Sequence, residues 1–152
     1  MLRAVLDANV FVSAFLQPKG PSGCILRGFL EQSSFEVVLS ESILAEVRGS
    51  MRYPRVRRRL ALSDLEIEAR IASIGLLADL VSGATKAHAV KEDFDDDKYV
   101  EAALEGQAGF VVSGDRHLLK LQQYEGIQIL SPRQFLNLIE AATTAPAPSD
   151  QI

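Results

Sequence analysis

Short apolar runs alternate with segments of helical periodicity along this chain, and that alternation limits the folds it can form. Five runs have the length and composition of buried strands, namely residues 2–6, 35–39, 76–81, 110–113 and 127–130. Between them, apolar residues recur every three or four positions, as in amphipathic helices. Strands separated by helices predict a sheet covered on both faces. We therefore expect an α/β fold, a three-layer α/β/α domain with a mainly parallel five-stranded sheet.

Local signals predict where the helices lie. Helices are expected over residues 9–16, 22–31, 41–53, 55–60, 64–75, 97–105 and 116–122, and from Pro132 onward. Ser40 is a good N-cap, Ser63 and Glu66 form a capping-box pattern, and Gly75 is expected to end its helix. We expect one domain over residues 1–141. Residues 142–152 contain few bulky apolar side chains and are expected to form a disordered tail.

Composition narrows the class of protein. A chain of 152 residues with 47% hydrophobic and 24% charged residues is typical of a globular domain. Its single cysteine, Cys24, cannot form an intrachain disulfide, which fits a reducing compartment. No segment reaches the roughly 20 apolar residues of a membrane span, and Asp7 interrupts the apolar start that a signal peptide requires. We expect a cytoplasmic protein that does not enter a membrane.

Aspartates follow two of the predicted strands. Asp7 comes directly after the first run, and Asp115 comes two residues after the fourth. Open α/β sheets bind ligands at this edge, where the strand order reverses, and the first and fourth strands are expected to be neighbours there. Asn9 and Ser113 could support these carboxylates through hydrogen bonds. Alternatively, each aspartate serves only as the N-cap of the helix that follows.

Two further acidic positions could reach the same edge. Glu46 lies beside the apolar face of the helix after the second strand, where the alternative is an ordinary solvated glutamate. Residues 93–97 contain four aspartates, which repel one another unless a cation lies nearby. Asp97 begins a helix and is the first choice as a ligand, with Asp96 second. Asp95 is expected to be an N-cap, and the alternative for the whole segment is a charged loop.

Converging carboxylates predict a metal ion. Mg²⁺ and Mn²⁺ prefer oxygen ligands, and a divalent cation relieves the repulsion between neighbouring carboxylates. Metals held in this way commonly act on phosphate groups. The acidic positions therefore predict a Mg²⁺ or Mn²⁺ site that handles a phosphate-containing substrate.

Basic residues cluster after the helix that carries Glu46. The net charge of −4 means that a polyanion would need a local basic patch. Arg48, Arg52 and Arg55 begin such a patch, and residues 57–59 are three further arginines. This cluster could bind an RNA backbone, receive an acidic segment of a partner protein, or form only a solvated surface.

Four segments in this order resemble the PIN domain family, the nuclease fold of many bacterial toxin–antitoxin toxins. They are Val-Leu-Asp-Ala-Asn-Val at 5–10, Ser-Glu-Ser-Ile-Leu-Ala-Glu-Val at 40–47, Asp-Asp-Asp-Lys-Tyr-Val-Glu-Ala-Ala-Leu at 95–104 and Phe-Val-Val-Ser-Gly-Asp-Arg-His-Leu-Leu at 110–119. The resemblance covers roughly residues 2–140. It is closest to the subgroup of toxins in which an aspartate-rich run precedes an alanine-rich helix.

The resemblance implies an endoribonuclease that uses Mg²⁺ or Mn²⁺. Asp7, Glu46, Asp97 and Asp115 match the acidic quartet of the family as catalytic residues and metal ligands, with Asp96 as the competitor of Asp97. Asn9 and Ser113 match its supporting polar positions. The implied partners are an RNA substrate and a cognate antitoxin, and homodimers are common in the family. The alternative is a non-catalytic RNA-binding or protein-interaction module on the same fold.

Overall fold

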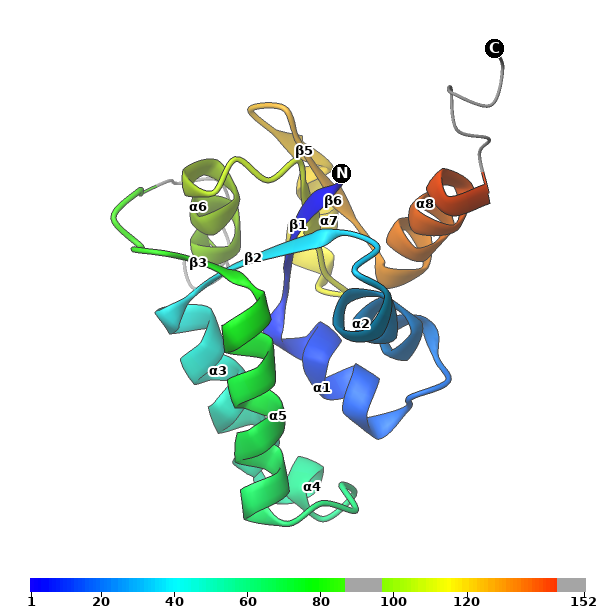
Figure 1. The fold of residues 1–152 in the computed structure, drawn as a ribbon. Coiled ribbons are helices and arrows are strands. Elements are labelled where there is room, and N and C mark those ends of the chain that lie inside the picture. Colours follow the sequence, from blue (N-terminus) through cyan, green and yellow to red (C-terminus); the bar gives the residue numbers. More distant parts are fainter. Residues whose placement is uncertain (87–96, 145–152) are drawn as a thin grey trace.

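Six strands form one sheet in the order β3-β2-β1-β4-β6-β5 in the computed structural model, which describes residues 1–86 and 97–144 (Figure 1). The strands are β1 (Arg3–Leu6), β2 (Glu36–Ser40), β3 (Asp79–Val81), β4 (Phe110–Val112), β5 (Gln123–Tyr124) and β6 (Ile127–Leu130). Every pairing is parallel except that of β5 with β6. The mainly parallel sheet is therefore confirmed, and β1 and β4 are neighbours as predicted.

The sheet has one strand more than the five predicted. The additional strand, β5, returns to β6 through Glu125 and Gly126, which have φ angles of 48° and 84°. Two consecutive positive φ angles are those of a type I′ hairpin turn, which asparagine or aspartate followed by glycine usually signals. Glutamate before Gly126 does not give that signal, so the sequence did not predict the hairpin.

Helices cover both faces of the sheet, which confirms the three-layer architecture (Figure 1). The helices are α1 (Ala8–Leu16), α2 (Pro21–Gln32), α3 (Glu41–Arg52), α4 (Pro54–Arg57), α5 (Asp64–Leu77), α6 (Asp97–Glu105), α7 (Arg116–Leu121) and α8 (Pro132–Thr144). Helix α6 packs on one face, and α2 and α8 lie on the other. No helix in these ranges is long and apolar enough to cross a membrane.

The last helix continues beyond the expected domain end at residue 141 and ends at Thr144. The tail predicted over residues 142–152 therefore begins within α8, and its part from residue 145 lies outside the described residues. At α3 and α5, the predicted N-caps are present, whereas Asp95, which was also expected to be an N-cap, lies outside the described residues. Ser40 accepts a hydrogen bond from the Ile43 N–H, and Ser63 and Glu66 form a reciprocal capping box.

The end of α5 differs from the prediction that Gly75 ends the helix and residues 76–81 form a strand. The helix continues to Leu77, the Ala78 N–H bonds to the Ile74 carbonyl, and β3 has only three residues. A glycine inside a helix costs only about 0.5–1 kcal/mol relative to alanine. Burial of Ile74 on the core side of the same turn offsets that cost.

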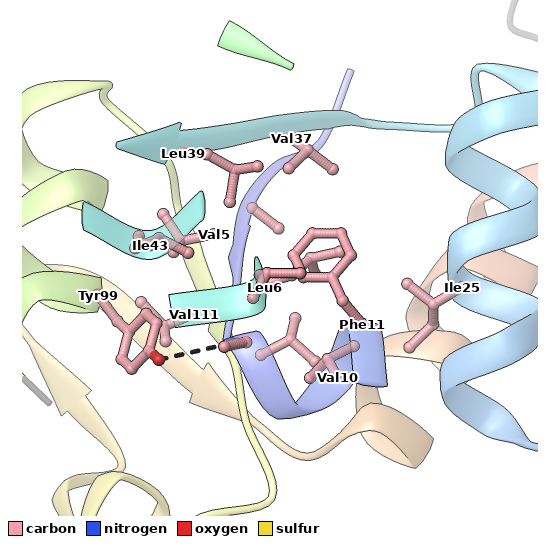
Figure 2. Packing of buried hydrophobic residues seen from close by; sticks show 14 of the residues in the cluster. Val5, Leu6, Val10, Phe11, Ile25, Val37, Leu39, Ile43, Tyr99 and Val111 are labelled. Atoms are coloured by element: carbon pink, nitrogen blue, oxygen red, sulfur yellow. Dashed lines mark hydrogen bonds between the residues drawn. The ribbon is translucent and has the colours of Figure 1, made fainter. Parts of the chain in front are cut away.

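The core lies on both sides of the central strands (Figure 2). Val5, Leu6 and Val111 are fully buried, as expected for parallel strands covered by helices on both faces. On the α2 and α8 side, the Phe35 and Phe135 rings meet edge to face, with centroids 5.1 Å apart and an interplanar angle of 83°. Burial of β1 and β4 on both faces fixes their C-terminal ends, which Asp7 and Ser113 follow.

Two helical glycines provide a test of how tightly α2 is packed. A Cβ at Gly23 would lie 2.1 Å from the Pro18 carbonyl oxygen, whereas a Cβ at Gly49 in α3 would have no neighbour within 4 Å. We expect Gly23→Ala to lower the free energy of unfolding by about 1–3 kcal/mol, because backbone must move. Gly49→Ala is expected to raise it by roughly 0.5–1 kcal/mol. Urea unfolding of both variants measures the difference, and equal effects would contradict it.

Candidate functional site

Asp7 lies at the C-terminal edge of the sheet, where β1 and β4 meet. The parallel register aligns Leu6 with Val112, and the Asp7 N–H continues the ladder by donating to the Val112 carbonyl at 3.0 Å. The Asp7 side chain is 3% exposed and caps α1, its Oδ1 accepting the Asn9 N–H at 3.0 Å. Asp7 can therefore act as the N-cap of α1 and still take part in a functional site. Asn9 supports the carboxylate through its backbone.

Ser113 joins the two aspartates at this edge. Its fully buried hydroxyl donates to Asp7 Oδ2 at 2.6 Å and accepts the Asp115 N–H at 2.9 Å. Asp115 is half-buried and caps α7, with Oδ1 accepting the His117 N–H at 2.7 Å. One hydroxyl thus fixes the Asp7 carboxylate relative to the start of α7.

Glu46 reaches the same region through Tyr99, a residue for which sequence reasoning proposed no polar contact. The Tyr99 hydroxyl donates to Glu46 Oε2 at 2.8 Å and accepts the Ala8 N–H at 3.5 Å. Figure 2 shows this hydroxyl directed toward the start of α1. The ring is 1% exposed, so α3, α6 and α1 meet at a single buried oxygen.

Lys98 forms an ion pair with Glu46, and this contact was also missed. Sequence reasoning proposed no such contact for Lys98. The available signal was its place in α6, directly between Asp97 and Tyr99. A lysine beside one acidic residue does not reveal which distant carboxylate it pairs with, because that depends on how α6 packs against α3.

Asp97 is the first residue of α6 and is 3% exposed. Its helix packs against β1 and β4, the strands that carry Asp7 and lead to Asp115. Asp95 and Asp96 lie outside the described residues. The choice between Asp96 and Asp97 as a ligand therefore stays a prediction that favours Asp97, a buried carboxylate at the correct end of its helix.

The electrostatics of Asp7 suit a cation. Burial raises the pKa of the Asp7 carboxyl, and the charge of Glu46 adds to that rise, whereas hydrogen bonds from Ser113, Asn9 and Tyr99 oppose it. Burial and the nearby carboxylates likewise raise the pKa of Tyr99, so its hydroxyl stays protonated. Across residues 1–86 and 97–144, no basic side chain forms an ion pair with Asp7.

The donor chemistry fits Mg²⁺ or Mn²⁺, because the residues supply carboxylate oxygens. Asp7, Asp97 and Asp115 are the residues that could hold such an ion, with Glu46 as a fourth carboxylate now paired with Lys98. As the side chains stand, the described residues contain no group of three or more acidic, histidine or cysteine side chains close enough to hold a metal. The structure therefore brings these carboxylates to one edge of the sheet, but not close enough together to form a complete set of metal ligands.

The predicted RNA-binding arginines differ in their contacts. Arg48 and Arg52 on α3 both pair with Glu68 on α5, at 3.3 Å and 2.6 Å. Arg55, in contrast, forms no ion pair within the described residues. It lines a hollow of about 500 Å³ with Tyr53, Val56, Arg58 and Arg59. The unpaired positive charge of the cluster therefore lies at α4 rather than along α3.

Removing the buried charge should stabilise the metal-free fold. Folding raises the pKa of the Asp7 carboxyl from its unfolded value of about 3.8. Asp7 therefore stabilises the fold when it is protonated, and this contribution is lost as the pH rises through the folded pKa. Asp7→Asn is expected to raise Tm at pH 7 in EDTA by roughly 2–4 °C, the effect of ~1 kcal/mol in a domain of this size. The difference should disappear near pH 3. Calorimetry at both pH values tests it, and a lower Tm at pH 7 would contradict it.

Comparisons with known proteins agree with this architecture. The uncharacterized protein MJ1680 of Methanocaldococcus jannaschii is 26% identical over 149 residues, which cover 91% of this chain and 92% of that protein. The crystal structure of PAE2754 from Pyrobaculum aerophilum superposes with a TM-score of 0.55 at 14% identity, covering 92% of this chain and 90% of that chain. A family model described as PIN domain matches residues 3–117, three-quarters of the chain. The chain therefore belongs to the PIN domain family, whose fold is generally that of nucleases.

Proposed function

We propose that this protein is a metal-dependent endoribonuclease that hydrolyses RNA phosphodiester bonds. The observation that supports this most directly is the buried Asp7 carboxylate. It is held by Ser113, lies beside the end of β4 and lacks a basic partner among the described residues. A buried carboxylate without a counter-charge costs stability, and proteins retain such groups mainly where they function.

The acidic side chains would have different roles in the reaction. Asp7 and Asp97, with Asp115 and Glu46, would hold Mg²⁺ or Mn²⁺. When bound, such an ion polarises a phosphodiester oxygen and lowers the pKa of a coordinated water. Asp7 or Asp97 would orient the attacking water and accept its proton. In-line attack would leave a 5′-phosphate and a 3′-hydroxyl.

Cleavage of a structured RNA in Mn²⁺ or Mg²⁺ tests the proposal, and α3 offers a matched pair of variants. Glu46 contacts Tyr99 and Lys98, whereas Glu41 is exposed in the first turn of the same helix. We expect Glu46→Gln to lower the cleavage rate by roughly 10–100-fold, the reduction typical of groups around a metal. Glu41→Gln should retain the rate.

Two controls locate the activity in this site. EDTA and Asp7→Asn should each abolish cleavage, and calorimetry should show that Asp7→Asn also abolishes Mn²⁺ binding. Cleavage that survives Asp7→Asn would place the activity elsewhere. Equal RNA binding with and without divalent metal, with no cleavage of any RNA, would favour the non-catalytic RNA-binding or protein-interaction module.

The arginines at α4 supply a separate prediction about RNA binding. Binding to single-stranded nucleic acid weakens as the salt concentration rises. Loss of one contact with a phosphate makes the slope of the logarithm of the binding constant against the logarithm of the salt concentration shallower by roughly 0.7. We expect Arg55→Gln to weaken RNA binding with such a change in slope. Arg133→Gln removes the same charge from the exposed side of α8 and should leave the slope unchanged. Filter binding over a salt series measures both, and equal slopes for all three proteins would exclude Arg55 from the interface.

The proposal also covers the biological setting, a cytoplasmic toxin of a toxin–antitoxin pair. The resemblance of the four segments to toxin sequences supports it, and RNA in the cytoplasm is the substrate such a toxin needs. Induced expression in a bacterial host should arrest growth, and Asp7→Asn should relieve the arrest. A small protein encoded beside this chain should restore growth when co-expressed with it. Growth arrest by the Asp7→Asn variant would contradict a nuclease toxin.

A further inference from the structure

The surface at α4 contains a hollow that is separate from the acidic edge. It measures about 500 Å³ and is lined by Tyr53, Arg55, Val56, Arg58 and Arg59. This volume lies within the range of roughly 300–1,000 Å³ that is usual for ligand sites. Figure 1 shows α4 at one end of the molecule, beside the end of α3 and the start of α5. One small surface therefore combines an aromatic ring with three guanidinium groups.

Tyr53 presents an exposed ring on a fixed backbone. The residue is 61% exposed. Its N–H donates to the Ser50 carbonyl at 3.3 Å, and its carbonyl accepts the N–H groups of Val56 and Arg57 at 2.9 and 2.8 Å. Pro54, which begins α4, further restricts the Tyr53 backbone. A tyrosine side chain has few rotatable bonds, so a ring on such a support can stack on another flat ring at a small entropic cost.

The positive charge that lines the hollow is not compensated by the described residues. Residues 48–59 contain six arginines. The three outside the hollow pair with acidic side chains of α5. The three that line it, Arg55, Arg58 and Arg59, are exposed and form no ion pair within residues 1–86 and 97–144. In a chain whose net charge is −4, this concentration of positive charge favours an anionic ligand from solution.

The segment that carries these arginines is anchored at its far end as well. Leu60 is 6% exposed, and its N–H donates to the Val56 carbonyl at 3.1 Å. Arg58 Nε donates to the Pro54 carbonyl at 3.2 Å, a bond that uses none of the donors on its two terminal nitrogens. Guanidinium groups bind phosphate oxygens through parallel hydrogen bonds of this kind of donor pair. The segment therefore offers phosphate donors on a support that is fixed at both ends.

We propose that the hollow at α4 is a nucleotide-binding site outside the acidic edge. An unpaired base would stack on the Tyr53 ring beside Val56. The phosphate attached to it would accept hydrogen bonds from Arg55, Arg58 or Arg59. Stacking needs a flat ring and the arginines need an anion, and a nucleotide supplies both. An acidic peptide would satisfy the arginines but leave the exposed ring unused. A free nucleotide and a nucleotide within an RNA strand share this chemistry.

The nucleotide-binding site lies near the acidic edge, at the end of a helix that both share. Tyr53 directly follows α3 and is seven residues beyond Glu46. At a rise of about 1.5 Å per residue, the two positions are roughly 10 Å apart along the helix axis. A strand held at α4 by one nucleotide could therefore extend to the carboxylates over only a few nucleotides. The proposal does not depend on the proposed nuclease activity, because the binding that it predicts needs no metal.

Fluorescence of 2-aminopurine, a base analogue that stacking quenches, tests the proposal. The full chain is titrated in EDTA into a single-stranded RNA hexamer that carries 2-aminopurine at an internal position. We expect saturable quenching, and Tyr53→Ala should weaken binding by about 5- to 150-fold, the equivalent of one stacked base. Tyr53→Phe keeps the ring and should retain the affinity. Leu65→Ala, which truncates an 81% exposed side chain on α5, should leave the affinity unchanged.

A salt series separates the role of the ring from that of the arginines. Tyr53→Ala should lower the affinity by the same factor at every salt concentration, because stacking releases no counterions. Arg58→Gln should also make the salt slope shallower by roughly 0.7, as expected for one lost phosphate contact. Both side chains are exposed, so both variants should keep the thermal transition of the unaltered protein. Binding of a duplex of the same sequence should be insensitive to Tyr53→Ala, because its bases stack on one another.

Competition identifies the source of the nucleotide. Displacement of the hexamer by 5′-AMP, lost in Tyr53→Ala, would assign the site to free nucleotides, and binding of the hexamer alone would assign it to RNA strands. Binding that depends on Tyr53 without cleavage in Mn²⁺ would support this site and count only against the proposed nuclease. Hexamer affinity that Tyr53→Ala leaves unchanged would overturn the proposal. Displacement by oligoglutamate at lower concentrations than by unlabelled hexamer would also overturn it, in favour of an acidic protein segment.

Discussion

Parallel pairing of β1 with β4 fixes the position of the groups at the acidic edge. Because Leu6 is in register with Val112, the residues that follow on the two strands, Asp7 and Ser113, leave the sheet side by side. Slipping this register by one residue would turn every buried side chain of a strand to the opposite face. The buried residues that determine the register therefore also determine the position of the Asp7 carboxylate. The geometry of the acidic edge thus depends on the packing of the core.

The same edge carries an unfavourable concentration of negative charge. Asp7 and Asp97 are both 3% exposed, and Glu46 reaches the region through the buried hydroxyl of Tyr99. Hydrogen bonds from Ser113 and Tyr99 hold the carboxylates in place without supplying a compensating charge. An arrangement that sacrifices stability in this way is typical of functional sites rather than of structural ones.

Local signals predicted the fold because strands and helix caps depend on residues that are close together in the sequence, and their order along the chain indicates the layers. The end of β1 at Leu6 and the caps at Ser40 and Ser63 follow directly from them. Contacts between distant segments could not be read in this way. Tyr99 and Glu46 are 53 positions apart, and their contact exists only because α6 and α3 approach each other. The pairing of Arg48 and Arg52 with Glu68 likewise depends on the packing of α5 against α3.

The ion pair of Lys98 with Glu46 changes how occupancy of this edge would be controlled. A tethered ammonium already supplies one positive charge, so the acidic residues are partly compensated as soon as the chain folds. A divalent cation that recruits Glu46 must compete with that ammonium. If this edge binds a divalent cation, as we propose, folding would be separated from metal supply, and occupancy would become an exchange between a cation that belongs to the chain and one drawn from the surrounding solution. Such an exchange would respond to the free concentration of the ion.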